Sequence, residues 1–264
     1  MSHSQTLTLG LALASAIALL ARRHGALTVS GAIAAAAIGA LAMAAGWSWG
    51  VLLIAYFVSS TVLSRFRAAE KATRTDGRVE KAGPRDAMQV LANGGVYAMA
   101  AVGLWVRPDA LWQALAAGAL AASAADTWAT EVGTLAGHAP RSILDGSPVA
   151  VGTSGGVSPA GLLAGLGAAG FIATVAWLVR WPGVTSVAAL IGGVSGCLLD
   201  SLLGASVQAR RWCATCRTFT EQRIHRCGAS TELSGGISWL DNDVVNAIST
   251  IGGALFGATA ASYL

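Results

Sequence analysis

Eight apolar windows, each long enough to cross a bilayer and with few or no charged residues, follow one another along the chain. A membrane-spanning helix takes about 20 residues, so these windows use most of the 264 residues. Only 11% of the residues are charged, whereas a water-soluble domain has about a quarter. We therefore predict an all-α integral membrane protein, with residues 1–264 forming a single polytopic domain. The expected spans are 5–21, 27–46, 48–64, 86–106, 110–134, 158–179, 184–207 and 238–263.

The loops between these spans divide the positive charge unequally. Of the 17 lysines and arginines, all but Arg107 and Arg180 fall on one side. Positively charged loops stay in the cytoplasm, so we expect both termini on the outer side of a cell inner or plasma membrane. Loops 65–85, 135–157 and 208–236 should then be cytoplasmic, with most basic residues of 65–85 on a solvated, lipid-facing surface. No nucleic-acid partner is expected.

Several acidic residues fall inside the expected spans, where a charged side chain costs about 2.5–3.5 kcal/mol by insertion scales. Asp126 and Asp200 lie nine or ten residues from the cytoplasmic ends of their spans, which is about 15 Å for both. They should therefore sit at one depth and face a cavity, a cation or a partner. For any one acid, a structural ion pair or a helix cap is the alternative. The predicted Mg²⁺ ligands are Asp126, Glu131, Asp200, Asp243 and Asn246.

The second half of the chain contains a tandem two-helix repeat. In each unit a span with a buried aspartate is followed by a polar loop, an SGG(V/I)S turn and a returning span, over 126–158 and again over 200–238. Two spans separate the units, so both have the same topology and their aspartates can face each other across a pseudo-twofold axis. Chance similarity between Gly- and Ala-rich helices is the alternative.

The segment 152–156, GTSGG, places backbone amides and hydroxyls just before a helix N-terminus. Such an arrangement favours a bound phosphate. Phosphate-binding amides beside carboxylates that can hold Mg²⁺ are what phosphoryl transfer requires. The predicted substrate- and nucleotide-binding residues are Gly152, Thr153, Ser154, Gly155, Gly156, Lys81, Arg85, Asn93 and Arg141.

Four metal-binding side chains lie close together in loop 208–236. Cys213 and Cys216 are followed by His225 and Cys227. In a cytoplasmic loop, where disulfides rarely persist, this set predicts a structural Cys₃His zinc site. Incidental reduced thiols and redox activity are the alternatives.

Several sequence strings resemble the transmembrane protein 19-like family, also known as domain of unknown function 92. They are RDAMQVLANG at 85–94, ADTWATEVG at 125–133, GTSGGVS at 152–158, DSLLGA at 200–205 and WLDNDVVN at 239–246. A plant member of that family is implicated as a phytyl-phosphate kinase in tocopherol biosynthesis. The pattern D-x₂-A-x₃-G-x₃-G at 126–137 is also similar to an element of the CTP-using phytol and dolichol kinases.

The resemblance implies a Mg²⁺-dependent kinase that transfers the terminal phosphate of CTP or another nucleoside triphosphate to an isoprenyl monophosphate. Asp126, Asp200 and Arg85 would be its catalytic residues. A CTP-dependent cytidylyltransferase acting on a lipid phosphate would use similar acids, and a transporter with an intramembrane acidic site would show similar repeats. The small-residue helix faces would also permit a homodimer in the bilayer.

Overall fold

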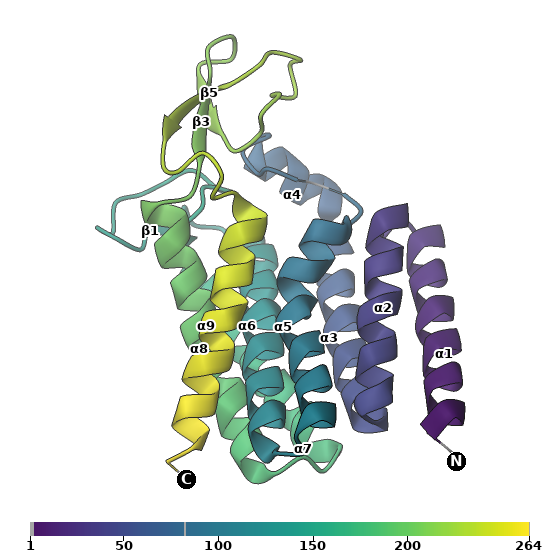
Figure 1. Cartoon of the computed structure of the whole chain (residues 1–264). Coiled ribbons are helices and arrows are strands. Elements are labelled where there is room, and N and C mark those ends of the chain that lie inside the picture. The colour runs from purple at the N-terminus through teal and green to yellow at the C-terminus, as the bar shows by residue number, and fades with distance from the viewer. Residues whose placement is uncertain (1–2, 82, 264) are drawn as a thin grey trace.

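The computed structural model describes residues 3–81 and 83–263, which form a bundle of long helices with two small sheets at one end (Figure 1). The helices are α1 (His3–Arg23), α2 (Val29–Ala45), α3 (Trp47–Arg65), α4 (Ala68–Thr75), α5 (Ala87–Val106), α6 (Ala110–Leu135), α7 (Pro159–Leu178), α8 (Gly183–Ser206) and α9 (Asn242–Ala261). The strands are β1 (Arg141–Ser142), β2 (Gly156–Val157), β3 (Arg210–Cys213), β4 (Thr218–Thr220) and β5 (Glu232–Gly235).

A helix lies in each of the apolar windows, which confirms a mostly helical membrane protein. Helices α3, α5, α7, α8 and α9 are long and apolar enough to cross a bilayer, and α2 is apolar but shorter. Helix α1 begins and α9 ends at the end of the bundle opposite the sheets (Figure 1). The number of spans and the side of the membrane on which each end lies stay predictions.

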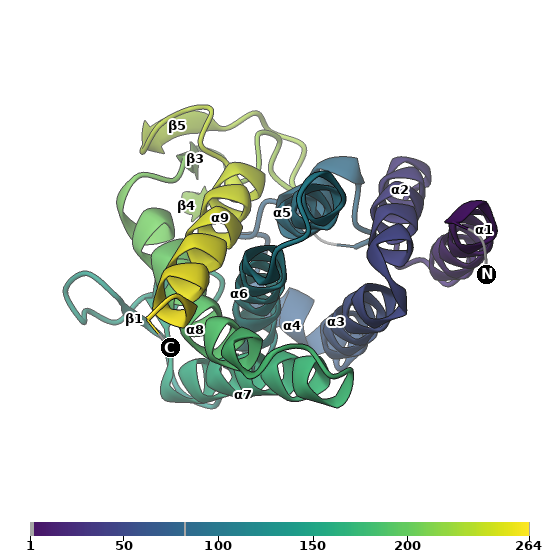
Figure 2. The ribbon, with the colours of Figure 1, turned by 60° about the horizontal axis from the view of Figure 1, so that its bottom comes forward.

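Helix α6 lies at the centre of the bundle, in contact with α3, α5, α7, α8 and α9 (Figure 2). Its middle is a run of alanines, glycine and serine that is almost fully buried. The Gly253 carbonyl oxygen of α9 fills the space that a Cβ would need at Gly118 of α6 and at Gly192 of α8. These three helices therefore meet at backbone contact, as small residues allow inside membranes.

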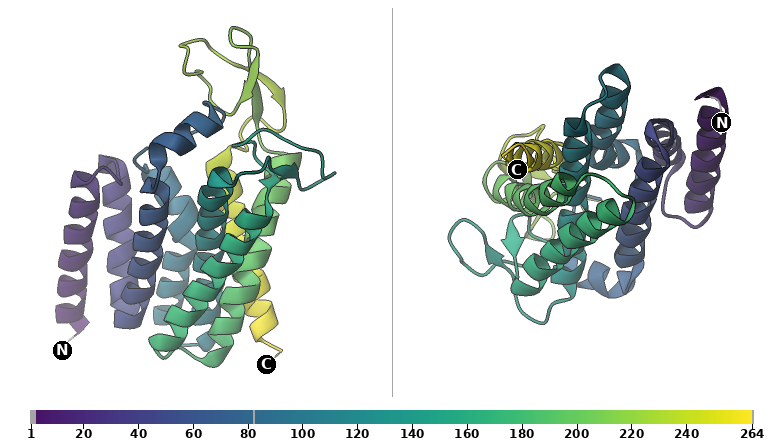
Figure 3. Two further views of the ribbon diagram at one scale, coloured as in Figure 1. Left: turned by 180° about the vertical axis from the view of Figure 1, so that it is seen from behind. Right: turned by 90° about the horizontal axis from the view of Figure 1, so that it is seen from below.

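Helices α1 and α2 form a pair at one edge of the bundle (Figure 3). Helix α1 packs on α2, and α2 in turn packs on α5 and α3. Thr28 caps α2 by accepting a hydrogen bond from the Gly31 amide at 3.1 Å. The backbone of Thr28 also donates to the Arg85 carbonyl oxygen at 3.0 Å, which ties this pair to the start of α5.

The loops are more ordered than the all-α prediction implies. Loop 65–85 contains α4, loop 135–157 contains the antiparallel pair β1–β2, and loop 208–236 contains an antiparallel sheet in the order β4–β3–β5. The prediction is therefore right for the bundle and wrong for these loops. Strands of two to four residues are too short to give a periodic pattern in the sequence.

The two repeat units both fold as a helix, a polar loop and a returning helix, but their turns differ. Ser158 caps α7 by accepting a hydrogen bond from the Gly161 amide at 3.1 Å. In the second unit the equivalent SGGIS segment begins inside β5, and Asp241 caps α9 by accepting from the Val244 amide at 3.2 Å. The expectation that both SGG(V/I)S turns directly precede a helix is therefore wrong for the second unit.

Candidate active site

A cavity of about 500 Å³ lies where the sheet-bearing ends of the helices meet the loops. Helices α3, α5, α6, α7, α8 and α9 form its walls, while α4, the turn 152–156 and Glu221 cover it. Its lining is rich in charged and polar side chains. Most of the acidic residues and turn residues singled out in the sequence are found here.

Asp126 of α6 and Asp200 of α8 bring their carboxyl groups into direct contact inside this cavity. Ser249 of α9 donates its hydroxyl to Asp200 Oδ2 at 3.1 Å. Neither carboxyl group forms an ion pair with a lysine or arginine in the part of the chain that the structure describes. Two carboxylates in contact cannot both stay charged without a cation or a shared proton. The structure thus brings together the two acids that the sequence places at one depth.

The close approach of these two aspartates depends on a glycine. At Gly196, one turn before Asp200 in α8, the Ala122 methyl group of α6 occupies the space where a Cβ would lie. The two helices therefore approach to backbone distance beside the acidic pair. A larger residue at this position would move the carboxyl groups apart.

Two further acids reach the cavity from the loops. Glu80 accepts a hydrogen bond from the Asn242 amide at 3.1 Å. Burial raises the pKa of Glu80, although this hydrogen bond acts in the opposite direction. Burial also raises the pKa of Glu221 to about 7, although Ser154 stabilises the charged carboxylate. Sequence reasoning missed both residues because neither lies in a span or in a recognisable spacing. The sequence offers one signal for Glu221, which lies between the two pairs of possible metal ligands in the Cys/His cluster.

The GTSGG turn contacts a carboxylate of the protein itself, that of Glu221. Gly152 and Gly155 have φ values of 84° and 78°, which favour glycine. The Thr153 and Gly156 amides are used within the loop, on the carbonyl oxygens of Ala150 and Thr153. Ser154 donates its hydroxyl to the Glu221 carboxylate.

Lys71 and Glu131 form an ion pair at the rim of the cavity. Lys71 is 6% exposed and also donates to the carbonyl oxygens of Leu63 and Ser64 at 2.7 and 2.9 Å. It is thus an exception to the solvated surface predicted for loop 65–85. Glu131, a predicted Mg²⁺ ligand, has its own counter-ion in this pair.

Lys81 joins two acids from different parts of the chain. It forms ion pairs with Asp86 at 2.9 Å and with Asp243 at 2.5 Å. Asp243 therefore has a cationic partner and does not line the cavity, whereas Asn246, one turn further along α9, does. The structure separates these two predicted Mg²⁺ ligands.

Three cations are predicted to bind phosphate: Lys81, Arg85 and Arg141. Lys81 and Arg85 line the cavity, but Lys81 is already paired with carboxylates. Arg85 forms no ion pair with a carboxylate in the part of the chain that the structure describes. Its Nη2 atom donates to Ser64 Oγ at 3.4 Å. Arg141 lies on β1, is exposed, donates to the Gly146 carbonyl oxygen at 2.7 Å and does not line the cavity. Arg141, one of the predicted substrate- and nucleotide-binding residues, therefore lies outside this cavity.

Asn93 of α5 belongs to a chain of buried hydrogen bonds. Its Oδ1 atom accepts from Ser123 Oγ at 2.6 Å, and Ser123 Oγ lies 2.7 Å from the Tyr56 hydroxyl. Its amide nitrogen donates to the Gln89 carbonyl oxygen at 2.8 Å. These bonds fix the side chain on the cavity wall.

A second, apolar cavity of about 90 Å³ lies between α1, α2, α3 and α5. Leucine, isoleucine, alanine and phenylalanine side chains dominate its lining. Arg85, Gln89 and Asn93 line both cavities. The acidic cavity therefore adjoins an apolar one at the position of Arg85.

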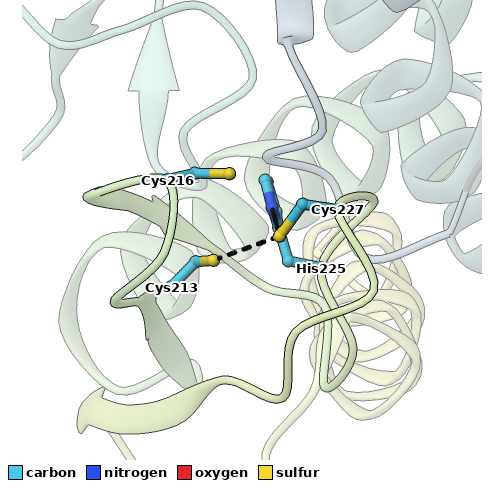
Figure 4. A group of neighbouring side chains, drawn as sticks. All are labelled: Cys213, Cys216, His225 and Cys227. Carbon is cyan, nitrogen blue, oxygen red and sulfur yellow. Dashed lines mark hydrogen bonds between the residues drawn. The ribbon is translucent and has the colours of Figure 1, made fainter.

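The four side chains of the Cys/His cluster come together in the sheet above the cavity (Figure 4). The ligand atoms of Cys213, Cys216, His225 and Cys227 all lie within 4.8 Å of one another. Cys213 ends β3, and the other three residues lie in the loops on either side of β4.

Comparison with known proteins places this chain among membrane proteins. Protein PGR of Arabidopsis thaliana is 29% identical to it, over 96% of this chain and 95% of PGR. Protein VTE6, chloroplastic, of the same plant is 29% identical, over 84% of this chain and 61% of VTE6. Uncharacterized membrane protein MJ0933 of Methanocaldococcus jannaschii is 27% identical, over 91% of this chain and 88% of MJ0933. No solved structure gives a significant match.

The family described as Integral membrane protein DUF92 matches residues 12–254. This match covers the bundle from α1 to α9, both cavities and the Cys/His cluster. The chain is therefore a member of the DUF92 family of integral membrane proteins.

Proposed function

We propose that this protein is a membrane-embedded prenyl-phosphate kinase, which transfers the terminal phosphate of CTP or another nucleoside triphosphate to an isoprenyl monophosphate. The observation that carries the proposal is the contact between Asp126 and Asp200 in a cavity that also contains Arg85 and the anion-binding turn. The family resemblance supplies the substrate, since a plant member is implicated as a phytyl-phosphate kinase.

The acidic pair fits a magnesium ion. Mg²⁺ prefers carboxylate and other oxygen ligands and is commonly held by one or two carboxylates together with substrate phosphates. Asp126 and Asp200 would hold it, with the Asn246 side-chain oxygen available on the same wall. When bound, Mg²⁺ would neutralise the charge of the nucleotide phosphates. The mutual repulsion of the two carboxylates is what makes a cation favourable here.

The residues of the protein would mainly position the reactants. Arg85 would pair with the phosphate of the lipid or of the nucleotide, because it has no carboxylate partner in the described chain. Ser154 would donate to a phosphate oxygen once Glu221 had moved away. A lipid monophosphate is already ionised at neutral pH, so its attacking oxygen needs no strong base. Orientation and charge neutralisation then account for most of the rate.

The apolar cavity supports a lipid as the acceptor. It begins at Arg85, where a phosphate would bind, and continues between α1, α2 and α3. The first few carbons of a prenyl chain would lie among its aliphatic side chains, and the rest of the chain would continue between the helices, while the phosphate stayed in the polar cavity.

The direct test is phosphate transfer by the purified protein in detergent. We expect label from γ-labelled CTP, with Mg²⁺ and a panel of prenyl monophosphates, to appear in a lipid diphosphate. Asp126→Asn and Asp200→Asn should abolish this transfer, while Asp145→Asn in the exposed loop between β1 and β2 should not.

The products separate the proposed kinase from its rivals. Release of CDP supports the kinase, whereas release of pyrophosphate with CMP attached to the lipid would establish a cytidylyltransferase. Absence of transfer with every nucleotide and chain length, together with nucleotide-independent uptake of the lipid phosphate by proteoliposomes, would replace the kinase with a transporter.

A further inference from the structure

We propose that Cys213, Cys216, His225 and Cys227 bind one structural zinc ion, and that this ion holds the β3–β4–β5 sheet as a cap over the acidic cavity. Here the cap means residues 208–236. The proposal concerns a site separate from the acidic pair and does not depend on the kinase assignment.

The distances within the cluster match those of a tetrahedral zinc site. Cys213 Sγ and Cys227 Sγ are 3.7 Å apart, and His225 Nδ1 is 3.3 Å from Cys227 Sγ. Zn–S bonds of about 2.3 Å and Zn–N bonds of about 2.0–2.1 Å in a tetrahedron give ligand separations of roughly 3.5–3.8 Å. Figure 4 shows the side chains turned toward one another from two loops of the cap. A zinc ion therefore needs little movement of the ligands.

Neither a disulfide bond nor an ordinary core histidine accounts for the cluster. A disulfide bond requires a separation of about 2.05 Å, so the 3.7 Å between Cys213 and Cys227 excludes one between them, and all four cysteines of the chain are free. His225 is only 2% exposed, and its Nδ1 atom lies 3.3 Å from Cys227 Sγ and close to the other two thiols of the cluster. A buried imidazole that faces three thiols fits a metal ligand better than a core histidine.

The cap has too few buried apolar side chains to hold its own fold. Trp212 and Phe219 pack edge to face across β3 and β4, with ring centroids 4.8 Å apart. Phe219, Ile224 and Leu233 are nevertheless 52%, 67% and 45% exposed. Structures this small generally need a metal ion or disulfide bonds for stability. A zinc ion joining the turn after β3 to the loop after β4 would provide that stability.

The segment between the two pairs of ligands forms the roof of the cavity. Thr220 Oγ1 donates to the Gly77 carbonyl oxygen at 2.8 Å, and the Glu221 amide donates to the Arg78 carbonyl oxygen at 2.9 Å. Gln222 Nε2 donates to the Val79 carbonyl oxygen at 3.1 Å. Zinc would thus fix the segment that holds Glu221 against Ser154 and holds loop 77–81 in place.

The first experiment is metal analysis of the whole protein, purified in detergent with a tag that contains no histidine. We expect about one zinc ion per chain without added metal. Cys216→Ser should lose the zinc, whereas Cys197→Ser, which removes a thiol on α8 outside the cluster, should keep it. Cys216 is exposed, so its replacement should not prevent insertion of the bundle.

A second measurement keeps the proposal testable if Cys216→Ser folds poorly. The unmodified protein, stripped with a chelator and titrated with Co²⁺, should show thiolate-to-cobalt charge-transfer bands and tetrahedral d–d bands. Stripping should also speed trypsin cleavage in the cap, and Zn²⁺ but not Mg²⁺ should reverse this. Folded protein without zinc, zinc retained by Cys216→Ser, or iron in its place would overturn the proposal. None of these readouts uses phosphate transfer.

Discussion

Ser154 donates its hydroxyl to the carboxylate of Glu221, which lies 67 positions further along the chain in the cap. The turn that could bind a phosphate therefore binds a side chain of the cap. A negatively charged substrate that uses Ser154 must displace Glu221, so substrate binding and movement of the cap are linked.

The Glu221 carboxyl group should make the stability of the protein depend on pH. Its pKa is raised from 4.5 to about 7, mainly by burial. Between these values the folded state holds a proton that the unfolded state has lost, so stability falls as the pH rises, by up to about 3 kcal/mol. Glu221→Gln should remove this part of the difference between the thermal unfolding midpoints at pH 5 and pH 8. The exposed Glu232 on β5 offers the matched control, and an unchanged pH dependence in Glu221→Gln would contradict the burial of this group.

Replacing one aspartate of the acidic pair should lower the activity and raise the stability of the protein. Asp126→Asn removes a like charge, so in the absence of Mg²⁺ we expect a higher unfolding midpoint, while turnover should fall by about 10²-fold or more. Addition of Mg²⁺ should raise the midpoint of the unmodified protein but not that of the variant, because a ligand that binds only the folded state stabilises it. Equal Mg²⁺ shifts in both proteins would show that the metal binds elsewhere.

Removal of the cation of the Lys71–Glu131 pair should destabilise the protein strongly. Lys71→Met leaves the half-buried Glu131 without its counter-ion, which should cost at most about 3–5 kcal/mol. The double variant Lys71→Met/Glu131→Gln should recover much of this loss. Thermal unfolding of the unmodified protein, Lys71→Met, Glu131→Gln and the double variant gives the coupling energy between the two side chains. Additive effects would mean that the two side chains do not interact.

The glycine junction of α6, α8 and α9 should tolerate no side chain. Gly118→Ala places a methyl group against the Gly253 carbonyl oxygen and should cost about 1–3 kcal/mol. Gly167→Ala on α7 is the matched control, because its Cβ would meet nothing within 4 Å. Thermal unfolding should separate the two variants, and equal midpoints would contradict the backbone contact.

Filling the apolar cavity should weaken binding of the lipid substrate and leave binding of the nucleotide unchanged. Ala35→Leu on α2 fills part of this cavity and should raise KM for a long-chain prenyl monophosphate several-fold, without changing KM for the nucleotide. Ala37→Leu, on the exposed face of the same helix, should change neither value. Steady-state kinetics with both substrates decides the matter, and a rise in KM for the nucleotide would argue against a tail site here.

Much of the membrane-embedded part was predictable from the sequence, because hydropathy and the cost of a charge in lipid act on each segment locally. The depth of Asp126 and Asp200 in their spans was enough to predict that they would sit at one level, and the repeat indicated that they could face each other. The cluster of Cys213, Cys216, His225 and Cys227 was likewise visible from its spacing.

The partners of the loop residues could not be predicted in this way. Lys71 reaches Glu131 because α4 folds back over the cavity, and Lys81 reaches Asp243 across 162 positions. Both pairings depend on the path of polar loops, which hydropathy does not specify. The same is true of Glu221, whose contact with Ser154 exists only because the cap folds over the turn.

The backbone contact of Gly253 with Gly118 and Gly192 has a consequence for biosynthesis. Helix α9 is made after α6 and α8, so the acidic pair lacks one of its walls, including Ser249, until α9 has entered the membrane. Until then the carboxyl groups are not enclosed, and incompletely folded chains are subject to degradation in the cell. A variant that delays insertion of α9 should therefore reduce the amount of protein in the cell more than it reduces the activity of each molecule that matures.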